Sequence, residues 1–223
     1  MKIVAINGSS RGRASNTHVM VSALLNGAQA AGAETVNVLL AEKEISHCRG
    51  CHSCWSATPG QCVTDDDMLG VLGAMAGASV VILASPVYFE NISGLLKTFM
   101  DRLTVIGSPH TRPSSASGHA SQPTSLDDTP IKLVMVANCG YADPSEFAVI
   151  SHWFRRVSQK LHMGIAGEIY APQGKILAAP PEELRPAALS YLQTLEEAGK
   201  ELVTDHKLSP RTAALLGQGI VRR

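Results

Sequence analysis

The sequence predicts an α/β protein built on a doubly wound parallel sheet, because short apolar strands alternate with amphipathic helices five times along the chain. The first run, KIVAI at 2–6, has the continuous apolar character of a strand buried on both faces. It ends in a polar loop that begins at Asn7 and Gly8. With 223 residues, 45% of them hydrophobic, the chain is long enough to form one such domain.

The other expected strands share this short apolar character, and they lie at 35–40, 79–84, 131–137 and 164–171. Each expected helix carries a start signal or an apolar stripe at helical spacing. The helices are expected after N-caps at 15–17, after a capping-box variant at 64–67, over 92–103, from the Asp143-Pro144-Ser145-Glu146 start, and over about 181–204. Pro186 marks either the true start of the last helix or a kink near it.

Composition limits the classes of partner. The 19 basic and 19 acidic residues balance, so there is no electrostatic footprint for nucleic acid or for an acidic membrane surface. No apolar run reaches the roughly 18 residues that span a bilayer, and the N-terminal apolar run is shorter than the core of a signal peptide. We therefore expect a cytoplasmic protein whose five cysteines are reduced and act as ligands or reactive groups.

The chain is expected to form one domain, residues 1–204, followed by a C-terminal arm at 205–223 that serves packing or oligomerisation. Two segments interrupt the alternation of strands and helices. One is a cysteine-rich loop at 46–63, and the other is an insertion at 107–130 that is rich in Ser, Pro, Gly and His and is typical of a flexible surface loop.

Ligands of open α/β sheets bind beyond the carboxyl ends of the strands, so the loops after strands one, three and four are the informative ones. The first loop, 8–17, combines backbone N–H groups, hydroxyls and a helix N-terminus that suit a phosphate dianion, with Arg11 or Arg13 adding charge. It lacks the Walker and GxGxxG patterns, and an ordinary N-capped turn remains an alternative. The other two loops bring Tyr88, Phe89 and Tyr141 to the same edge of the sheet, where planar side chains could support a ring.

Four cysteines follow the spacing C-x2-C-x2-C-x7-C: Cys48, Cys51, Cys54 and Cys62. A compact run of this kind suits a [4Fe–4S] cluster, in which each iron takes one cysteine and the chain wraps the cube. A structural zinc site and four uncoordinated thiols are the alternatives, although zinc sites more often use two separated cysteine pairs. Cys139 lies far along the chain and is expected to be a small loop residue rather than a ligand.

The runs GSSRGRASNT at 8–17 and SPVYFENISGLLKTFMDR at 85–102 resemble the NAD(P)H-dependent FMN reductase branch of the flavodoxin-like superfamily. The cysteine run is similar to that of the iron–sulfur flavoproteins, a subgroup of the same family. The resemblance implies a flavodoxin-like three-layer sheet of five parallel strands in the order 2-1-3-4-5. It also implies that the helix ending at Asp101 and Arg102 takes part in a dimer, with an exposed helix-end ion pair as the simpler alternative for these two residues.

The same resemblance implies the FMN ligands. The phosphate would be held by Ser9, Arg11, Ser15, Asn16 and Thr17. The isoalloxazine would contact Pro86, Val87, Tyr88 and Phe89, and its cradle would be completed by Asn138, Gly140 and Tyr141.

These observations lead to three hypotheses of function. The first is an FMN-dependent oxidoreductase that couples FMN to a [4Fe–4S] cluster, with NAD(P)H or ferredoxin as donor and a quinone, oxygen or another carrier as acceptor. The second is an NAD(P)H-dependent FMN or quinone reductase without a cluster, whose cysteine loop is structural or binds zinc. The third is a non-catalytic flavin-bound carrier or regulatory module. The resemblance further implies a homodimer or homotetramer. No catalytic side chain is expected, because the flavin itself carries the chemistry.

Overall fold

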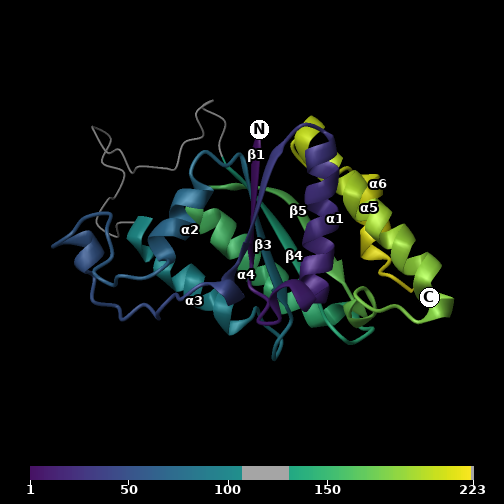
Figure 1. Ribbon diagram of the computed structural model, residues 1–223, viewed down its shortest axis with the longest axis horizontal. Helices are drawn as coiled ribbons and strands as arrows, with labels where there is room; N and C mark the ends of the chain where they lie inside the picture. Colours follow the sequence, from purple (N-terminus) through teal and green to yellow (C-terminus); the bar gives the residue numbers. More distant parts are fainter. Residues whose placement is uncertain (107–130, 222–223) are drawn as a thin grey trace.

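The computed structural model describes residues 1–106 and 131–221, so the insertion expected at 107–130 lies outside the described residues. The described part contains a parallel sheet of five strands in the order β2-β1-β3-β4-β5 (Figure 1). The strands are β1 (Lys2–Asn7), β2 (Glu34–Leu39), β3 (Val80–Pro86), β4 (Lys132–Asn138) and β5 (Gly164–Ala171). This arrangement confirms the predicted fold class and strand order.

Helices cover both faces of the sheet, which gives three layers (Figure 1). One face carries α1 (Asn16–Ala30), α5 (Arg185–Thr204) and α6 (Pro210–Gly217). The other face carries α2 (Met68–Met75), α3 (Gly94–Arg102) and α4 (Ala148–Leu161). Within the described residues, none of these helices combines the length and apolar character needed to cross a membrane.

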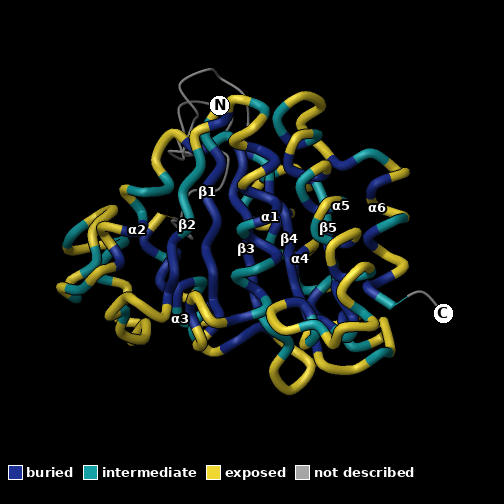
Figure 2. The backbone as a smooth tube through the Cα atoms, turned by 45° about the vertical axis from the view of Figure 1, so that its right-hand side comes forward, coloured by how far each residue is buried: buried dark blue, intermediate teal, exposed yellow. Residues whose placement is uncertain are grey.

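The three central strands, β1, β3 and β4, are buried on both sides, which explains their continuous apolar sequences, whereas the edge strands β2 and β5 are partly exposed (Figure 2). In β1, Ile3 and Ala5 pack into the core under α1 and α5, whereas Val4 and Ile6 pack into the core under α3 and α4. Because successive side chains point to opposite faces, a strand between two helical layers needs apolar residues at every position.

The predicted capping box at 64–67 is wrong. Asp67 stands at the N-cap of α2, but its side chain makes no capping bond; its Oδ2 accepts a hydrogen bond from the Glu44 N–H at 2.8 Å. Asp66 Oδ1 instead accepts from the Met68 N–H at 3.1 Å. The acidic run therefore fastens the segment that precedes the cysteine loop (residues 46–63).

Two other helix starts differ slightly from the expected ones. The helix expected from Asp143 begins with a 3-10 turn, Pro144–Phe147, capped by the Asp143 side chain, and α4 follows from Ala148. The closing helix begins at Arg185 after a 3-10 turn at Glu182–Leu184. Pro186 lies in the first turn of α5, where a proline ring costs no hydrogen bond, so it marks the start of the helix rather than a kink.

The C-terminal arm packs on its own domain. Leu208, Leu216 and Ile220 are buried in the core between β5, α5 and α6. Ser209 caps α6, and its Oγ donates to Glu201 Oε1 of α5 at 2.8 Å. These contacts make the arm part of the helical layer on this face.

Helices α1 and α5 cross at very short range because two glycines face the opposite backbone. A Cβ on Gly27 would lie 1.8 Å from the Glu196 carbonyl oxygen, and one on Gly199 would lie 2.0 Å from the Leu24 carbonyl oxygen. Only glycine permits this approach at either position.

We expect Gly199→Ala to lower the free energy of unfolding by about 1–3 kcal/mol or more, because the methyl group forces the two helices apart. The matched control is Gly70→Ala in α2, where a Cβ meets open space and the substitution stabilises the helix by up to about 1 kcal/mol. Urea unfolding of both variants measures the difference, and equal effects would contradict the close crossing.

Candidate functional site

A cleft opens at the carboxyl ends of β1, β3 and β4, where the strand order reverses between β1 and β3. Loops after four of the strands contribute to it. The described residues that line it are Ser9, Arg11, Ser15, Asn16, Thr17, Pro86, Val87, Tyr88, Asn138, Cys139, Gly140 and Lys175.

The first loop presents the N-terminus of α1 to the cleft. Ser15 Oγ donates to the Gly12 carbonyl oxygen at 2.7 Å and accepts from the His18 N–H at 3.0 Å, so it caps the helix. The N–H groups of Asn16 and Thr17 belong to the first turn and have no partner within the helix. Together with the helix dipole they make this edge of the cleft electropositive.

Hydrogen bonds hold the other loops against α1, one of them buried and one exposed. Asn138 Nδ2, at the end of β4, donates to Thr17 Oγ1 at 2.7 Å, which leaves the Thr17 hydroxyl its own hydrogen to donate. Asn16 Oδ1 accepts from the Ala178 N–H at 2.9 Å and so fixes the segment that follows β5. The cleft wall is thus rigid on this side.

The second loop is fixed through α3. Ser93 caps α3, and its Oγ donates to the Gly8 carbonyl oxygen at 2.6 Å. A Cβ on Gly8 would lie 2.6 Å from Leu96 Cβ, so only glycine lets α3 sit this close to the end of β1. The Ser93 N–H donates to Ser85 Oγ at 2.8 Å, which joins the helix to the end of β3.

The charges at the cleft favour an anion. The described residues that line it include two cations, Arg11 and Lys175, and no carboxylate. Arg13, the other arginine of the first loop, points elsewhere and pairs with Glu42 at 3.1 Å on the exposed surface. Of the two arginines suggested by the sequence, the structure brings Arg11 to the cleft.

Lys175 was missed by the sequence analysis. It reaches the cleft because the Gln173 N–H donates to the Tyr141 carbonyl oxygen at 2.7 Å, and the Gly174 N–H donates to the Cys139 carbonyl oxygen at 2.8 Å. These bonds join the loop after β5 to the loop after β4. The Gly-Lys pair just beyond a predicted strand was the available signal.

One aromatic residue of the second loop, Tyr88, lies at the cleft. Tyr88 lines it, with its hydroxyl 3.4 Å from Ser10 Oγ. Tyr88 and Asn91 exchange backbone hydrogen bonds around Phe89 and Glu90, whose φ angles are +49° and +66°. Such a turn normally takes Asn or Gly, so two larger residues here store strain of the kind found at functional sites.

The structure brings ten of the twelve residues expected to bind FMN to this cleft. Phe89 is fully exposed and Tyr141 is largely exposed, and neither is among the described residues that line it. Their contact with a flavin ring stays a prediction. Cys139 lines the cleft but is buried, and its thiol donates to the Tyr141 carbonyl oxygen at 3.4 Å.

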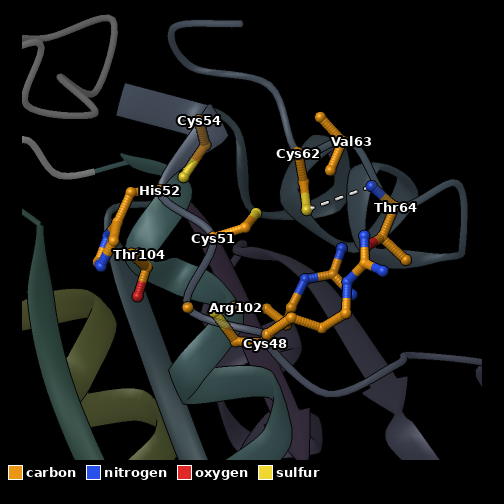
Figure 3. Close-up of a pocket in the computed structure, with 11 residues that line it drawn as sticks. Cys48, Cys51, His52, Cys54, Cys62, Val63, Thr64, Arg102 and Thr104 are labelled. Carbon is orange, nitrogen blue, oxygen red and sulfur yellow. Dashed lines mark hydrogen bonds between the residues drawn. The ribbon is translucent and has the colours of Figure 1, made fainter. Parts of the chain in front are cut away.

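A second pocket lies in the cysteine loop, which projects beyond α2 at the left of Figure 1. Cys48 and Cys51 are exposed, whereas Cys54 and Cys62 are half-buried. The residues around this pocket are drawn in Figure 3, and they are Cys48, Arg49, Gly50, Cys51, His52, Cys54, Cys62, Val63, Thr64, Arg102 and Thr104. All four cysteines of the motif therefore line this one pocket.

A match to a family model decides the family. Residues 1–140 match the model described as NADPH-dependent FMN reductase. The chain belongs to this family. The match includes the first two loops of the cleft, all of the cysteine loop and Asn138 at the end of β4.

The curated relatives that this chain matches include proteins named iron–sulfur flavoproteins. The chain is 41% identical over 102 residues to an iron–sulfur flavoprotein of Methanocaldococcus jannaschii, covering 46% of this chain and 51% of the relative. It is 35% identical over 106 residues to the iron–sulfur flavoprotein of Methanosarcina thermophila, covering 48% and 54%. The chain thus matches about half the length of these relatives. The predicted resemblance to the iron–sulfur flavoprotein subgroup is confirmed.

Solved structures support the fold. An NAD(P)H:quinone oxidoreductase from Methanothermobacter marburgensis superposes with a TM-score of 0.64 at 12% identity, over 91% of this chain and 98% of that one. An NADH:FMN oxidoreductase gives 0.57 at 18% identity, over 95% and 93%. At these identities the likeness concerns the fold alone.

The cleft fits the phosphate and ring of the family's cofactor in the chemistry of its donors: hydroxyls, helix N–H groups, two cations and one tyrosine face. The cysteine pocket fits a cluster in donor type and number. Its thiols stand apart, since in the described residues no three His, Cys, Asp or Glu side chains converge tightly enough to hold a metal ion.

Hydrogen bonds tune the thiols of this pocket. The Thr64 N–H, 3.5 Å from Cys62 Sγ (Figure 3), lowers the pKa of Cys62, and the nearby Arg102 guanidinium lowers it further. Hydrogen bonds from Ser53 lower the pKa of Cys51. Burial, followed by the neighbouring Cys62, raises the pKa of Cys54.

The exposed helix-end pair considered for Asp101 and Arg102 is wrong for Arg102. Asp101 pairs with Lys97 at 2.6 Å on the surface, whereas Arg102 turns inward and pairs with Asp66 at 2.5 Å. Arg102 is buried because it meets a carboxylate 36 residues earlier in the chain, which sequence spacing could not reveal. The dimer contact expected for this helix stays a prediction.

Asp66 is expected to give the fold a pH-dependent stability. Burial opposes its ionisation, but hydrogen bonds from Arg102 and from the Ser46 and Met68 N–H groups outweigh burial and lower the pKa from 3.8 to about 2. A lowered pKa stabilises the folded state above about pH 4, and this contribution disappears as the pH falls toward 2.

We therefore expect Asp66→Asn to lower the free energy of unfolding by about 3 kcal/mol at pH 7, because it leaves Arg102 buried without its carboxylate. At pH 3 the difference shrinks by about 1 kcal/mol, since the native protein has already lost part of the Asp66 contribution. Asp101→Asn, which breaks an exposed pair, costs less than about 1 kcal/mol. Urea unfolding at both pH values tests this, and a difference independent of pH would contradict it.

Proposed function

We propose that this chain is an FMN-dependent oxidoreductase that binds FMN in the cleft and a [4Fe–4S] cluster in the cysteine pocket. The observation that carries the proposal is the gathering of all four motif cysteines around one pocket of an FMN reductase fold. The subgroup of the relatives supports it, because they are named iron–sulfur flavoproteins. The chain matches about half their length, so donor, acceptor and assembly remain part of the proposal.

The residues of the cleft have distinct tasks in this proposal. The N-terminus of α1, the Thr17 hydroxyl and Arg11 would hold the phosphate. Pro86, Val87 and Tyr88 would face the ring, and Asn138 and Gly140 would lie along its edge. Bound FMN accepts electrons singly or in pairs, which lets a two-electron hydride donor serve one-electron partners.

The cysteine pocket would supply the one-electron centre. Cys48, Cys51, Cys54 and Cys62 would each hold one iron. The Thr64 N–H, which already points at Cys62 Sγ, would stabilise the charge on that ligand. NAD(P)H or a reduced ferredoxin would be the donor, and a quinone, oxygen or another carrier would be the acceptor.

A reductase without a cluster is the second candidate, favoured by the exposure of Cys48 and Cys51 and by the spread of the thiols. Steady-state oxidation of NAD(P)H with a quinone distinguishes either enzyme from a flavin-bound carrier that turns over nothing.

Phosphate recognition can be tested apart from ring binding. We expect Arg11→Ala to raise the Kd for FMN about tenfold, because one charge-assisted hydrogen bond is lost, and to leave riboflavin binding unchanged. Arg13→Ala, which removes an equal charge outside the cleft, leaves both affinities unchanged. Quenching of flavin fluorescence measures each Kd. Equal weakening of FMN and riboflavin would contradict the assigned position of the phosphate.

The cluster is tested by iron and acid-labile sulfide after anaerobic purification and reconstitution. We expect one [4Fe–4S] cluster per chain, lost together with its broad visible absorption in Cys48→Ser, while FMN is retained. Cys139→Ser is the matched control, because Cys139 lies outside the cysteine pocket and should leave iron unchanged. FMN without iron in the native protein would favour the reductase without a cluster.

A further inference from the structure

Arg102 is a buried cation in the wall of the cysteine pocket. Its side chain is 2% exposed and that of its partner Asp66 is 6% exposed. A buried guanidinium is costly unless its donors are satisfied, so its position reflects a specific set of partners. Lys97, one turn earlier on α3, is the contrasting case, since its side chain is 54% exposed and pairs on the surface.

The partners of Arg102 lie at the two ends of the cysteine loop. Nη1 donates to the Ser46 carbonyl oxygen at 2.9 Å and to Asp66 Oδ2, while Nη2 donates to Asp66 Oδ1 at 3.1 Å. The Ser46 N–H donates to the same Asp66 Oδ2 at 3.0 Å. Ser46 begins the loop and Asp66 follows its end, so one guanidinium closes the neck of the loop from α3.

A second contact closes the neck on the side that is farther from the cysteines along the chain. The Glu44 N–H donates to Asp67 Oδ2 at 2.8 Å, and the Asp67 N–H donates to the Glu44 carbonyl oxygen at 3.1 Å. These two bonds involve no guanidinium. The Ser46–Asp66 part of the neck therefore depends on Arg102, whereas the Glu44–Asp67 part does not.

Arg102 also contacts the pocket itself. It lines the space around the four cysteines (Figure 3), and its positive charge lowers the pKa of Cys62. The other arginine of the pocket, Arg49, lies on the exposed part of the loop. Arg102 thus holds a buried guanidinium, paired with Asp66, beside one ligand position, whereas Arg49 is exposed.

We propose that Arg102 is a positioning residue that closes the neck of the cysteine loop and raises the reduction potential of a cluster bound there by placing a fixed positive charge beside Cys62. Reduction adds one electron, and a nearby buried cation stabilises the more negative form. The effect on the potential rests on the proposed function, whereas the closing of the neck does not.

The neck is tested on the full chain without metal by amide hydrogen exchange. Arg102→Gln should raise exchange across 46–64 at least tenfold and leave α1 and α5 unchanged, because these helices lie on the opposite face of the sheet. Lys97→Gln, which removes an equal charge from the same helix, should change nothing in the loop. Unchanged exchange in Arg102→Gln overturns the neck assignment. If that variant does not fold, Arg102→Lys tests the same point, because a lysine cannot donate from two nitrogens to the Asp66 carboxylate.

The charge is tested by redox titration of the reconstituted protein. Arg102→Gln should lower the cluster potential by at least about 59 mV, a tenfold change for a one-electron couple. Arg102→Lys keeps the positive charge, so the cluster potential should shift by less than half as much as in Arg102→Gln. The amide hydrogens of its cysteine loop should nevertheless exchange faster than in the native chain. Equal potentials in all variants with full iron content overturn the role of the charge. If the native chain takes up no iron under any condition, the proposed function fails, and hydrogen exchange alone decides the role of Arg102 in the neck.

Discussion

Both candidate sites depend on α3, because buried polar groups that belong to other segments hold its two ends. At the start of the helix, Ser93 bonds to Gly8 and Ser85, which fixes the loops around the cleft. At the end, Arg102 bonds to Asp66 and Ser46, which fixes the cysteine loop. A helix of nine residues is about 13 Å long, so the cleft and the cysteine loop are held at a short and constant separation.

Local patterns were enough to predict the strands and the loops that meet at the cleft, whereas the strand order and the FMN-binding role of single residues followed from the family resemblance. Apolar runs identify buried strands, and carboxyl ends of parallel strands meet at one edge, so Asn16, Tyr88 and Gly140 could be expected to converge. Contacts between distant segments could not be predicted in this way. Lys175 reaches the cleft because main-chain hydrogen bonds join two loops. Main-chain groups are the same in almost every residue type, so the sequence does not reveal which of them pair.

The acidic run at 65–67 shows the same limit in a single segment. Asp66 and Asp67 follow a pattern that equally suits a helix cap or a salt bridge, and local sequence cannot distinguish the two. The presence of Arg102, 36 residues later, decides between them. A buried ion pair gains little stability over apolar packing, so its value here is best explained by the fixed geometry that it gives to the loop.

The cysteine loop is fixed at its ends and open in its middle, and this combination suits a site completed by its ligand. Closing a flexible loop costs conformational entropy, and the hydrogen bonds of the neck offset that cost before a ligand binds. Between the ends, the chain has a 3-10 turn at Ser53–Trp55 and exposed thiols at Cys48 and Cys51, so it can still adjust around an inorganic cube. Because Arg102 and Asp66 hold the two ends, binding of the proposed cluster would reshape the middle of the loop rather than its neck.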